Sequence, residues 1–277
     1  MIPMSRIRML AALAALVLGL ASAIGPAVAE VRIDITNGQM RPLPIAIPDF
    51  AGAAPQDAQI GRDIARVVSA DLERSGLFKP VDPRAFIQSV ASLQVQPRFA
   101  DWKAINAEAL VQGRAEVTPD GRLRVEFRLW DVFSETHMTG LAFNAQPADW
   151  RRLSHKVADA IYKRITGEDG YFDTQIVYIA ESGPKADRKK RLAIMDQDGE
   201  NHRFLSDPSE LVLTPRFSPN TREITYLSYY RNTPRVYIFN LDTGRREELG
   251  KFSGMTFAPT FSPDGNTIAF SLAEGGN

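Results

Sequence analysis

The stretch FSPNTREITY, from Phe217 to Tyr226, decides the fold because it recurs as FSPDGNTIAF from Phe261 to Phe270. The two copies align without a gap at an offset of 261 − 217 = 44 residues, and each has an aromatic residue, a proline-containing turn and an alternating apolar strand. The offset extends beyond them to Leu192 and Val236, Ile194 and Ile238, Asp198 and Asp242, and Leu205 and Leu249. A period of roughly 40 to 50 residues made of short strands predicts β-propeller blades.

The number of repeats is small for a propeller. A blade is a four-stranded sheet that is stable only when neighbouring blades stack around a central channel. The copies begin near Ile176 and Ile224, and the chain ends at Asn277 just after the opening strand of a third copy. Because natural propellers have roughly four to eight blades, we expect about two blades here and a C-terminal continuation of more than ~100 residues.

The first residues, Met1 to Ala29, predict an export signal. Arg6 and Arg8 form a positive n-region, Met9 to Ile24 is almost wholly apolar, and Ala27-Val28-Ala29 is a small-residue cleavage site. An uncleaved membrane anchor, the alternative, needs about 20 apolar residues, and this run is shorter. We expect export by the general secretion route, cleavage after Ala29 and no membrane insertion of the mature chain.

Composition excludes several classes of function. The chain has 33 basic and 33 acidic residues, and removal of Arg6 and Arg8 leaves 31 against 33, a formal charge of −2. This balance gives no support for a nucleic-acid partner. The sequence has no cysteine, which excludes disulfides, a thiolate nucleophile and a cysteine-ligated metal.

An α+β domain is expected from Glu30 to Gly167, ahead of the propeller portion at 168–277. Period-two alternation predicts strands, and apolar spacings of three and four residues predict helices. The expected strands are Leu43 to Ile47, Phe78 to Val81, Ala109 to Val117, Leu123 to Trp130 and about Met138 to Asn144. The expected long helices are Asp57 to Leu72 and Pro147 to Ile165, and Asp101 is a plausible cap for a turn that contains Trp102.

The segment Glu30-Val31-Arg32-Ile33-Asp34-Ile35 alternates charged and apolar residues and is followed by the turn signal Asn37-Gly38. This pattern is typical of a half-buried edge strand of the domain. The alternative is an arm that pairs with the sheet edge of a partner protein. The residues leave both interpretations open.

In the propeller portion, the pattern predicts two loops ahead of the repeats, Leu211 to Arg216 and Phe252 to Thr260. Loops at one end of a propeller form a broad surface that suits protein binding. Met255 and Phe257 in the second loop belong to residue types enriched at interface cores. Packing between blades is the alternative role for these two side chains.

Motifs that carry chemistry are missing from the sequence. His137, His155 and His202 are isolated from one another and from carboxylates at ligand spacing, so no metal or other cofactor is expected. There is no Gly-x-Ser-x-Gly elbow and no glycine-rich phosphate loop. We therefore expect a binding module and no enzyme.

Two other classes stay open on the residues alone. The chain could be the propeller of an exported prolyl-oligopeptidase-like peptidase, which requires a nucleophile elbow downstream of Asn277. It could also be a solute-binding propeller, for which convergent polar groups would line the channel.

Three segments together resemble the TolB family, the periplasmic proteins of the Tol-Pal system. They are EVRIDI from Glu30 to Ile35, PLPIAIPDF from Pro42 to Phe50, and the repeated TPRFSP and APTFSP from Thr214 to Pro219 and from Ala258 to Pro263. The resemblance covers Glu30 to Asn277. It implies a six-bladed propeller and a monomeric, non-enzymatic periplasmic protein that maintains outer-membrane integrity and assists envelope constriction in cell division.

The resemblance also implies two partners and their contact residues. The lipoprotein Pal is expected on the propeller, and the inner-membrane protein TolA on the N-terminal segment. Matched to this sequence, the TolA-binding residues are Glu30, Val31, Arg32, Ile33, Asp34 and Ile35. The Pal-facing residues are Leu213, Thr214, Met255, Phe257 and Ala258.

Overall fold

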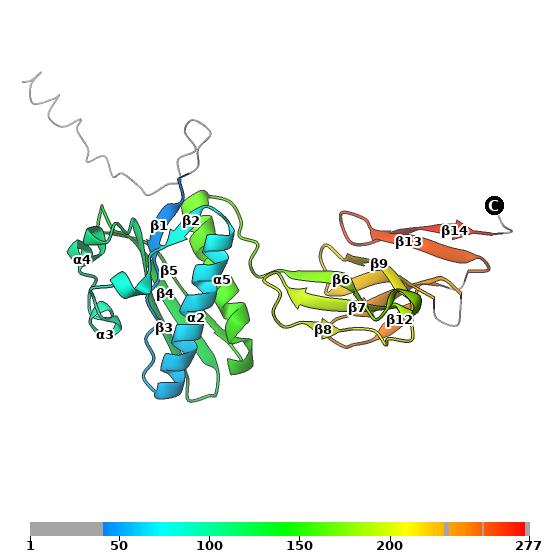
Figure 1. The fold of residues 1–277 in the computed structure, drawn as a ribbon, viewed down its shortest axis with the longest axis horizontal. Coiled ribbons are helices and arrows are strands. Elements are labelled where there is room, and N and C mark those ends of the chain that lie inside the picture. The colour runs from blue at the N-terminus through cyan, green and yellow to red at the C-terminus, as the bar shows by residue number, and fades with distance from the viewer. Residues whose placement is uncertain (1–40, 230–232, 251, 275–277) are drawn as a thin grey trace, which may run out of the picture. The chain divides into compact units, whose positions relative to one another are not determined.

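The computed structural model describes residues 41–229, 233–250 and 252–274 (Figure 1). The expected export signal and the segment Glu30 to Ile35 lie outside these residues. The described chain divides into two compact units, the first ending at Gly170 and the second beginning at Tyr171. Each unit is described by itself.

The first unit is built on one five-stranded sheet with the strand order β2-β1-β3-β4-β5. Its strands are β1 (Leu43–Ala46), β2 (Phe78–Pro80), β3 (Ala109–Val117), β4 (Leu123–Asp131) and β5 (Thr136–Ala145). β1 runs parallel to β2 and β3, and β3, β4 and β5 form an antiparallel meander. The two edge strands of the sheet are therefore β2, which has three residues, and β5, which has ten.

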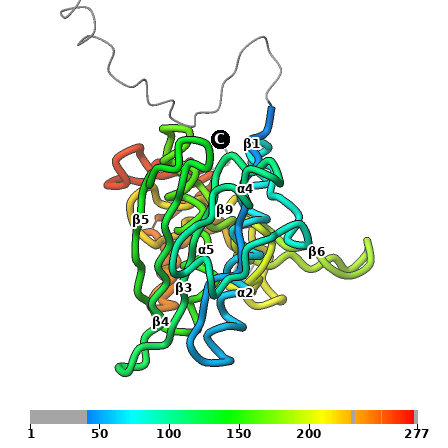
Figure 2. The backbone as a smooth tube through the Cα atoms, turned by 90° about the vertical axis from the view of Figure 1, so that its left-hand side faces the viewer, coloured from blue at the N-terminus to red at the C-terminus, as the bar shows by residue number. Residues whose placement is uncertain are grey.

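Two long helices, α2 (Pro55–Arg74) and α5 (Trp150–Thr166), cover one face of this sheet (Figures 1 and 2). Alternate β4 residues supply the buried face, namely Leu123, Val125, Phe127 and Leu129. The α5 stripe predicted from the sequence is buried at Leu153, Val157, Ile161 and Ile165. A 3-10 turn, η2 (Pro147–Asp149), precedes α5, and Gly167 ends the helix in the left-handed region with φ +81°.

A buried polar contact joins the two helices. Asp71 on α2 is fully buried, and its Oδ2 lies 2.6 Å from Nδ1 of His155 on α5. Arg74 donates from Nη1 to the other carboxylate oxygen at 2.9 Å. A carboxylate removed from water requires partners of this kind. The residues are 84 positions apart, so local sequence patterns could not reveal the pair.

Short helices between β2 and β3 cover part of the opposite face. They are η1 (Pro83–Ala85), α3 (Val90–Leu93) and α4 (Phe99–Ala104). Trp102 is fully buried here among Leu93, Leu110 and Val132. The N-cap of α4 is Arg98; Asp101 lies inside the first turn and forms an ion pair with Arg98 at 2.6 Å. The predicted cap at Asp101 is therefore wrong.

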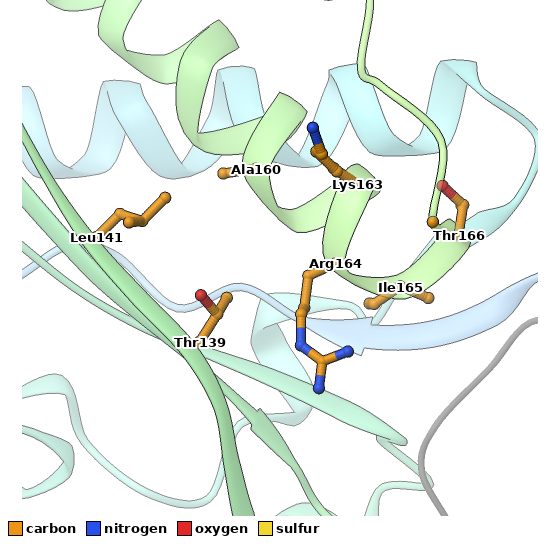
Figure 3. Close-up of a pocket in the computed structure, with 8 residues that line it drawn as sticks. Thr139, Leu141, Ala160, Lys163, Arg164, Ile165 and Thr166 are labelled. Atoms are coloured by element: carbon orange, nitrogen blue, oxygen red, sulfur yellow. The ribbon is translucent and has the colours of Figure 1, made fainter.

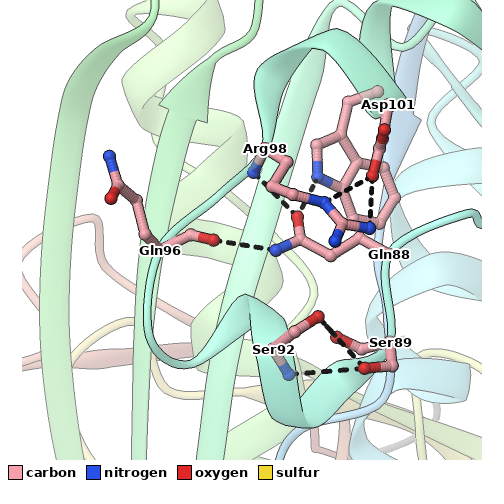
Figure 4. A network of polar contacts seen from close by, with 7 residues as sticks. Gln88, Ser89, Ser92, Gln96, Arg98 and Asp101 are labelled. Carbon is pink, nitrogen blue, oxygen red and sulfur yellow. Dashed lines mark hydrogen bonds and ion pairs between the residues drawn. The ribbon is translucent and has the colours of Figure 1, made fainter.

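Two buried glutamines, Gln88 and Gln112, fix this layer of short helices, and Figure 4 shows the contacts of Gln88. Oε1 of Gln88 accepts from Trp102 Nε1 at 3.0 Å and from the Arg98 backbone N–H at 2.8 Å, while its Nε2 donates to the Gln96 carbonyl at 2.7 Å. Gln112 on β3 donates to the Leu93 carbonyl at 2.7 Å, which ties α3 to the sheet. Both polar groups of the Gln88 side chain, the carbonyl oxygen and the amide nitrogen, thus have partners inside the protein.

In the second unit, the strands form three sheets, which confirms propeller blades after an α+β domain. The first has the order β6 (Gln175–Ser182), β7 (Lys189–Asp196), β8 (Arg203–Phe204), with the 3-10 turn η3 (Lys185–Asp187) between β6 and β7. The second has the order β12 (Arg246–Glu248), β11 (Arg235–Asn240), β10 (Glu223–Ser228), β9 (Val212–Phe217). The third pairs β13 (Met255–Phe261) with β14 (Ile268–Ala273).

An apolar core joins the first and second sheets. Its buried members are Leu192 and Ile194 of β7, together with Val212, Ile224, Tyr226, Tyr237 and Leu241. The repeat partners of Leu192 and Ile194 are Val236 and Ile238 on β11, and β11 in turn contacts β13 of the third sheet. Equivalent faces of successive sheets thus pack on the next sheet, as the 44-residue period predicts.

The two repeated turns also contact each other. Nδ2 of Asn220 donates to the Asp264 carbonyl at 2.7 Å. A Cβ at Gly265 would lie 2.2 Å from Oδ1 of Asn220, and Gly265 has φ +68°, so the site requires glycine. Thr221 occupies the Gly265 position in the first copy and is absent from the positive-φ residues, so the two turns differ in backbone conformation.

The glutamine network predicts a specific loss of stability. Gln88→Leu leaves the buried Trp102 Nε1–H and the Arg98 N–H without an acceptor, and should destabilise the first unit by about 2–4 kcal/mol. The same change at exposed Gln59, which bonds Asp63 on the surface, should change stability by less than about 0.5 kcal/mol. Urea unfolding followed by tryptophan fluorescence measures this, because all three tryptophans lie in the first unit. Equal midpoints for the two variants would contradict it.

Candidate functional site

The residues expected to face Pal lie on strands rather than in loops. Leu213 and Thr214 are on β9, and Met255, Phe257 and Ala258 are on β13. β9 forms one edge of the second sheet and contacts β13. The loop prediction was wrong because Pro215 and Pro259 interrupt the two runs, and proline inside a run argues against a strand.

Each proline occupies a β-bulge. Opposite β10, the register passes from Leu227↔Leu213 to Thr225↔Arg216, so Tyr226 faces the two residues Thr214 and Pro215. The third sheet has the same shift, with Phe270 facing Ala258 and Pro259. A bulge removes a ladder hydrogen bond, and proline has no N–H to lose there. The bulges are 44 residues apart, like the repeats.

The residue before each proline has an unfavourable backbone conformation. Thr214 has φ +49° and Ala258 has φ +47°. A non-glycine residue in this region costs of order 1–3 kcal/mol, and such residues cluster at functional sites. Both side chains are exposed, so they are not held there by burial of their own apolar surface. The second and third sheets therefore each have a strained and exposed residue at the same position of the repeat.

Apolar side chains repeat on the same strands. Leu211 is 41% exposed and Met255 is 44% exposed, and the two are 44 residues apart. Leu213 and Phe257, the next pair at this offset, are half-buried. We call Leu211, Leu213, Met255 and Phe257 the repeated apolar positions. Leu211 was missed as a site residue, although its offset from Met255 could have identified it.

A polar cluster fixes the chain where β9 begins. The Glu210 carboxylate accepts from Arg246 Nη1 at 2.7 and 2.6 Å and from Ser228 Oγ at 3.2 Å. The Arg246 guanidinium lies 4.1 Å from the Tyr237 ring centre, and burial raises the pKa of the neighbouring Tyr226 phenol above its ordinary value. These contacts hold the paired carboxylate of Glu210 next to Leu211 in the chain.

Two of the three histidines have aromatic neighbours. His137 packs edge-on against Trp130 at 5.1 Å, and His202 against Phe204 at 4.7 Å between ring centres. Within the described residues, no contact places His137 or His202 beside a nucleophilic side chain. Within the same described ranges, no helix is both long enough and apolar enough to cross a membrane.

The fold defines a class of protein in which an α+β domain precedes propeller blades. Two family models match the chain, the TolB amino-terminal domain over residues 31–138 and the TolB beta propeller domain over residues 162–277. The chain is similar to the Tol-Pal system protein TolB of Paramagnetospirillum magneticum, at 77% identity over 257 residues, or 93% of this chain and 58% of the relative.

A solved structure agrees with these matches. The chain is similar to the crystal structure of TolB from Acinetobacter baumannii, with a TM-score of 0.71 and 28% identity, over 90% of this chain and 59% of that one. The chain belongs to the TolB family, and it spans less than two thirds of the length of these two relatives.

The strained position gives a second prediction. Thr214→Gly removes the Cβ that disfavours positive φ, and should stabilise the second unit by up to about 1 kcal/mol after the larger unfolded-state entropy of glycine is counted. Thr260→Gly, at an exposed strand position of β13 with ordinary φ, should destabilise the same unit by about 0.5–1 kcal/mol. Native-state hydrogen exchange of the β10 and β11 amides reports both changes. If Thr214→Gly destabilised the second unit, the inference that the backbone at Thr214 is strained would be wrong.

Proposed function

We propose that the chain is a periplasmic protein–protein interaction scaffold of the Tol-Pal system, which binds Pal through its propeller and TolA through its N-terminal segment. Through these contacts it maintains outer-membrane integrity and supports envelope constriction in cell division. The observation that carries the proposal is the match of both units to the TolB family models. The proposed role needs two binding surfaces and no catalysis.

The Pal site is proposed on β9 and β13, the strands that carry the two bulges, which we call the inner strands. Protein-binding sites combine apolar anchors with a rigid backbone. The repeated apolar positions supply exposed Leu and Met side chains, and the Glu210–Arg246 cluster and the two bulges restrict the backbone around them. Apolar anchors of this kind suit an apolar patch on a folded lipoprotein domain.

The TolA site is proposed on Glu30 to Ile35, which lie outside the described residues. The sequence pattern supports this site, because three charged residues alternate with Val31, Ile33 and Ile35. An extended segment of this type adds to a sheet edge through its main-chain groups, while alternate side chains enter pockets. The charged and apolar sides of the arm would then face water and TolA respectively.

Deletion of the arm tests the two-site arrangement. Without Glu30 to Ile35, affinity for purified TolA should fall more than about a hundredfold, while affinity for Pal stays within a factor of two. Isothermal titration against each partner measures both. A matched control replaces Arg41 and Arg62 by Ala, which changes two exposed residues of the same unit and should alter neither affinity. Unchanged TolA affinity after deletion would exclude the arm.

Truncation of the exposed anchors tests the Pal site. Met255→Ala and Phe257→Ala should each weaken Pal binding by about 1–2 kcal/mol, or five- to thirtyfold, because anchor side chains dominate interface energies. Phe204→Ala is the matched control: Phe204 is 42% exposed on the outer strand β8, and its loss should leave Pal binding unchanged. If Phe204→Ala weakens Pal binding and the β13 variants do not, the site lies elsewhere on the propeller.

A further inference from the structure

The free edge of the first unit carries a feature that the proposed function does not use. β5 is the edge strand of the five-stranded sheet and is ten residues long. Its sequence, THMTGLAFNA, has no Lys, Arg, Asp, Glu or Pro. Edge strands of soluble proteins are normally protected by charges, proline or short length, because an unpaired edge is a template for another strand. An unprotected edge of this length indicates a binding site or an aggregation hazard.

Only the beginning of this edge is protected. The register shift between Leu129 and Trp130 leaves Met138 without a ladder partner, and Nε of Arg164 on α5 donates to the Met138 carbonyl at 3.1 Å. Beyond this bulge, from Thr139 to Asn144, the described chain offers β5 no backbone hydrogen bonds except those with β4. Six residues of strand, about 20 Å at ~3.3 Å per residue, therefore have an outer edge available.

A groove runs along this edge on the helix side of the sheet. It has a volume of about 750 Å³ and is lined by Thr139 and Leu141 of β5 and by Ala160, Lys163, Arg164 and Ile165 of α5. In Figure 3, Leu141 and Thr139 extend from the strand on the side where α5 presents Ala160 and Arg164. Leu141 is 47% exposed. The groove thus offers apolar surface beside an open strand edge.

Cationic groups flank both faces of the edge. Lys163 lines the groove, and its Nζ is held by Asp169 at 2.6 Å in a pair that is exposed on both sides and so contributes little. On the opposite face, Arg128 pairs in register with Gly140, and its Cγ would lie 3.4 Å from a Cβ at that glycine. Arg128 is exposed, and none of the ion pairs of the described chain includes it. Glycine inside a strand often marks close approach by another chain.

We propose that β5 binds an extended, acidic and apolar segment of a partner protein by strand addition along Thr139 to Asn144. Main-chain hydrogen bonds to the open edge supply affinity, as in other cases of β-augmentation. Alternate apolar side chains enter the groove at Leu141 and Ala160. Carboxylates on the segment alternate with these apolar side chains, so they lie on the opposite face and meet Arg128. The residues of this surface differ from those proposed to bind Pal and TolA.

The test uses the purified full chain and a pool of eight-residue peptides that alternate Asp or Glu with Val, Ile, Leu or Phe. Hydrogen–deuterium exchange should show new protection in Thr139 to Asn144. Fluorescence anisotropy should show at least tenfold weaker binding for Arg128→Glu. Lys79→Glu on the opposite edge strand, exposed like Arg128, is the charge-matched control and should bind as the parent chain does.

Three results would overturn the proposal. One is the absence of new protection on β5. Another is equal binding of a pool in which Lys and Arg replace the acidic residues. The third is binding that occurs only after residues 30–35 are deleted, which would assign the edge to the chain's own N-terminal segment. None of these results depends on whether Pal or TolA binds.

Discussion

The second unit depends on one constraint: a single β-sheet of this kind exposes two apolar faces, and each face must be covered by another sheet. Leu192 and Ile194 on β7 are completely buried because Ile224 and Tyr226 of the next sheet cover them. Successive sheets must then present equivalent faces at equivalent positions. This requirement explains why equivalent residues recur at a fixed offset of 44 residues in the sequence.

The same constraint explains the details of the inner strands. Both bulges place a proline where no N–H is needed, and both place a non-glycine residue at positive φ immediately before it. Because this bulge with its positive-φ residue occurs twice at the repeat distance, it belongs to the repeated fold and is not specific to one segment. The contact of Asn220 with the Asp264 carbonyl links the two repeated turns directly. The inner strands therefore present their exposed side chains on a fixed backbone.

Sequence reasoning succeeded where periodicity is strong and local. The long helices and the β3–β4 hairpin are found within three residues of their predicted positions. It failed at β9 and β13, where proline inside a strand is tolerated only because of the bulge. It also missed Gln88, Gln112 and the Asp71–His155 contact, since each joins segments that are distant in sequence or irregular in structure. Tertiary hydrogen bonds of this type leave no periodic signal.

For the candidate sites, the sequence identified Met255 and Phe257 by residue type and gave their positions incorrectly as loop. Thr214 and Ala258 were expected only from the family resemblance, and their strain is known from the backbone angles. Leu211 is identified only when the offset is combined with exposure. The open edge of β5 could not be predicted, because the order of strands in a sheet depends on how the strands pair and cannot be inferred from the sequence of a single strand.

The most direct test of the scaffold role is affinity capture from periplasmic extract with the tagged chain as bait, followed by mass spectrometry. The account predicts that Pal and TolA are both enriched over an untagged control, and that no peptide-hydrolysing activity copurifies. Enrichment of neither protein, together with cleavage of a peptide substrate by the captured chain, would contradict it and favour a peptidase propeller.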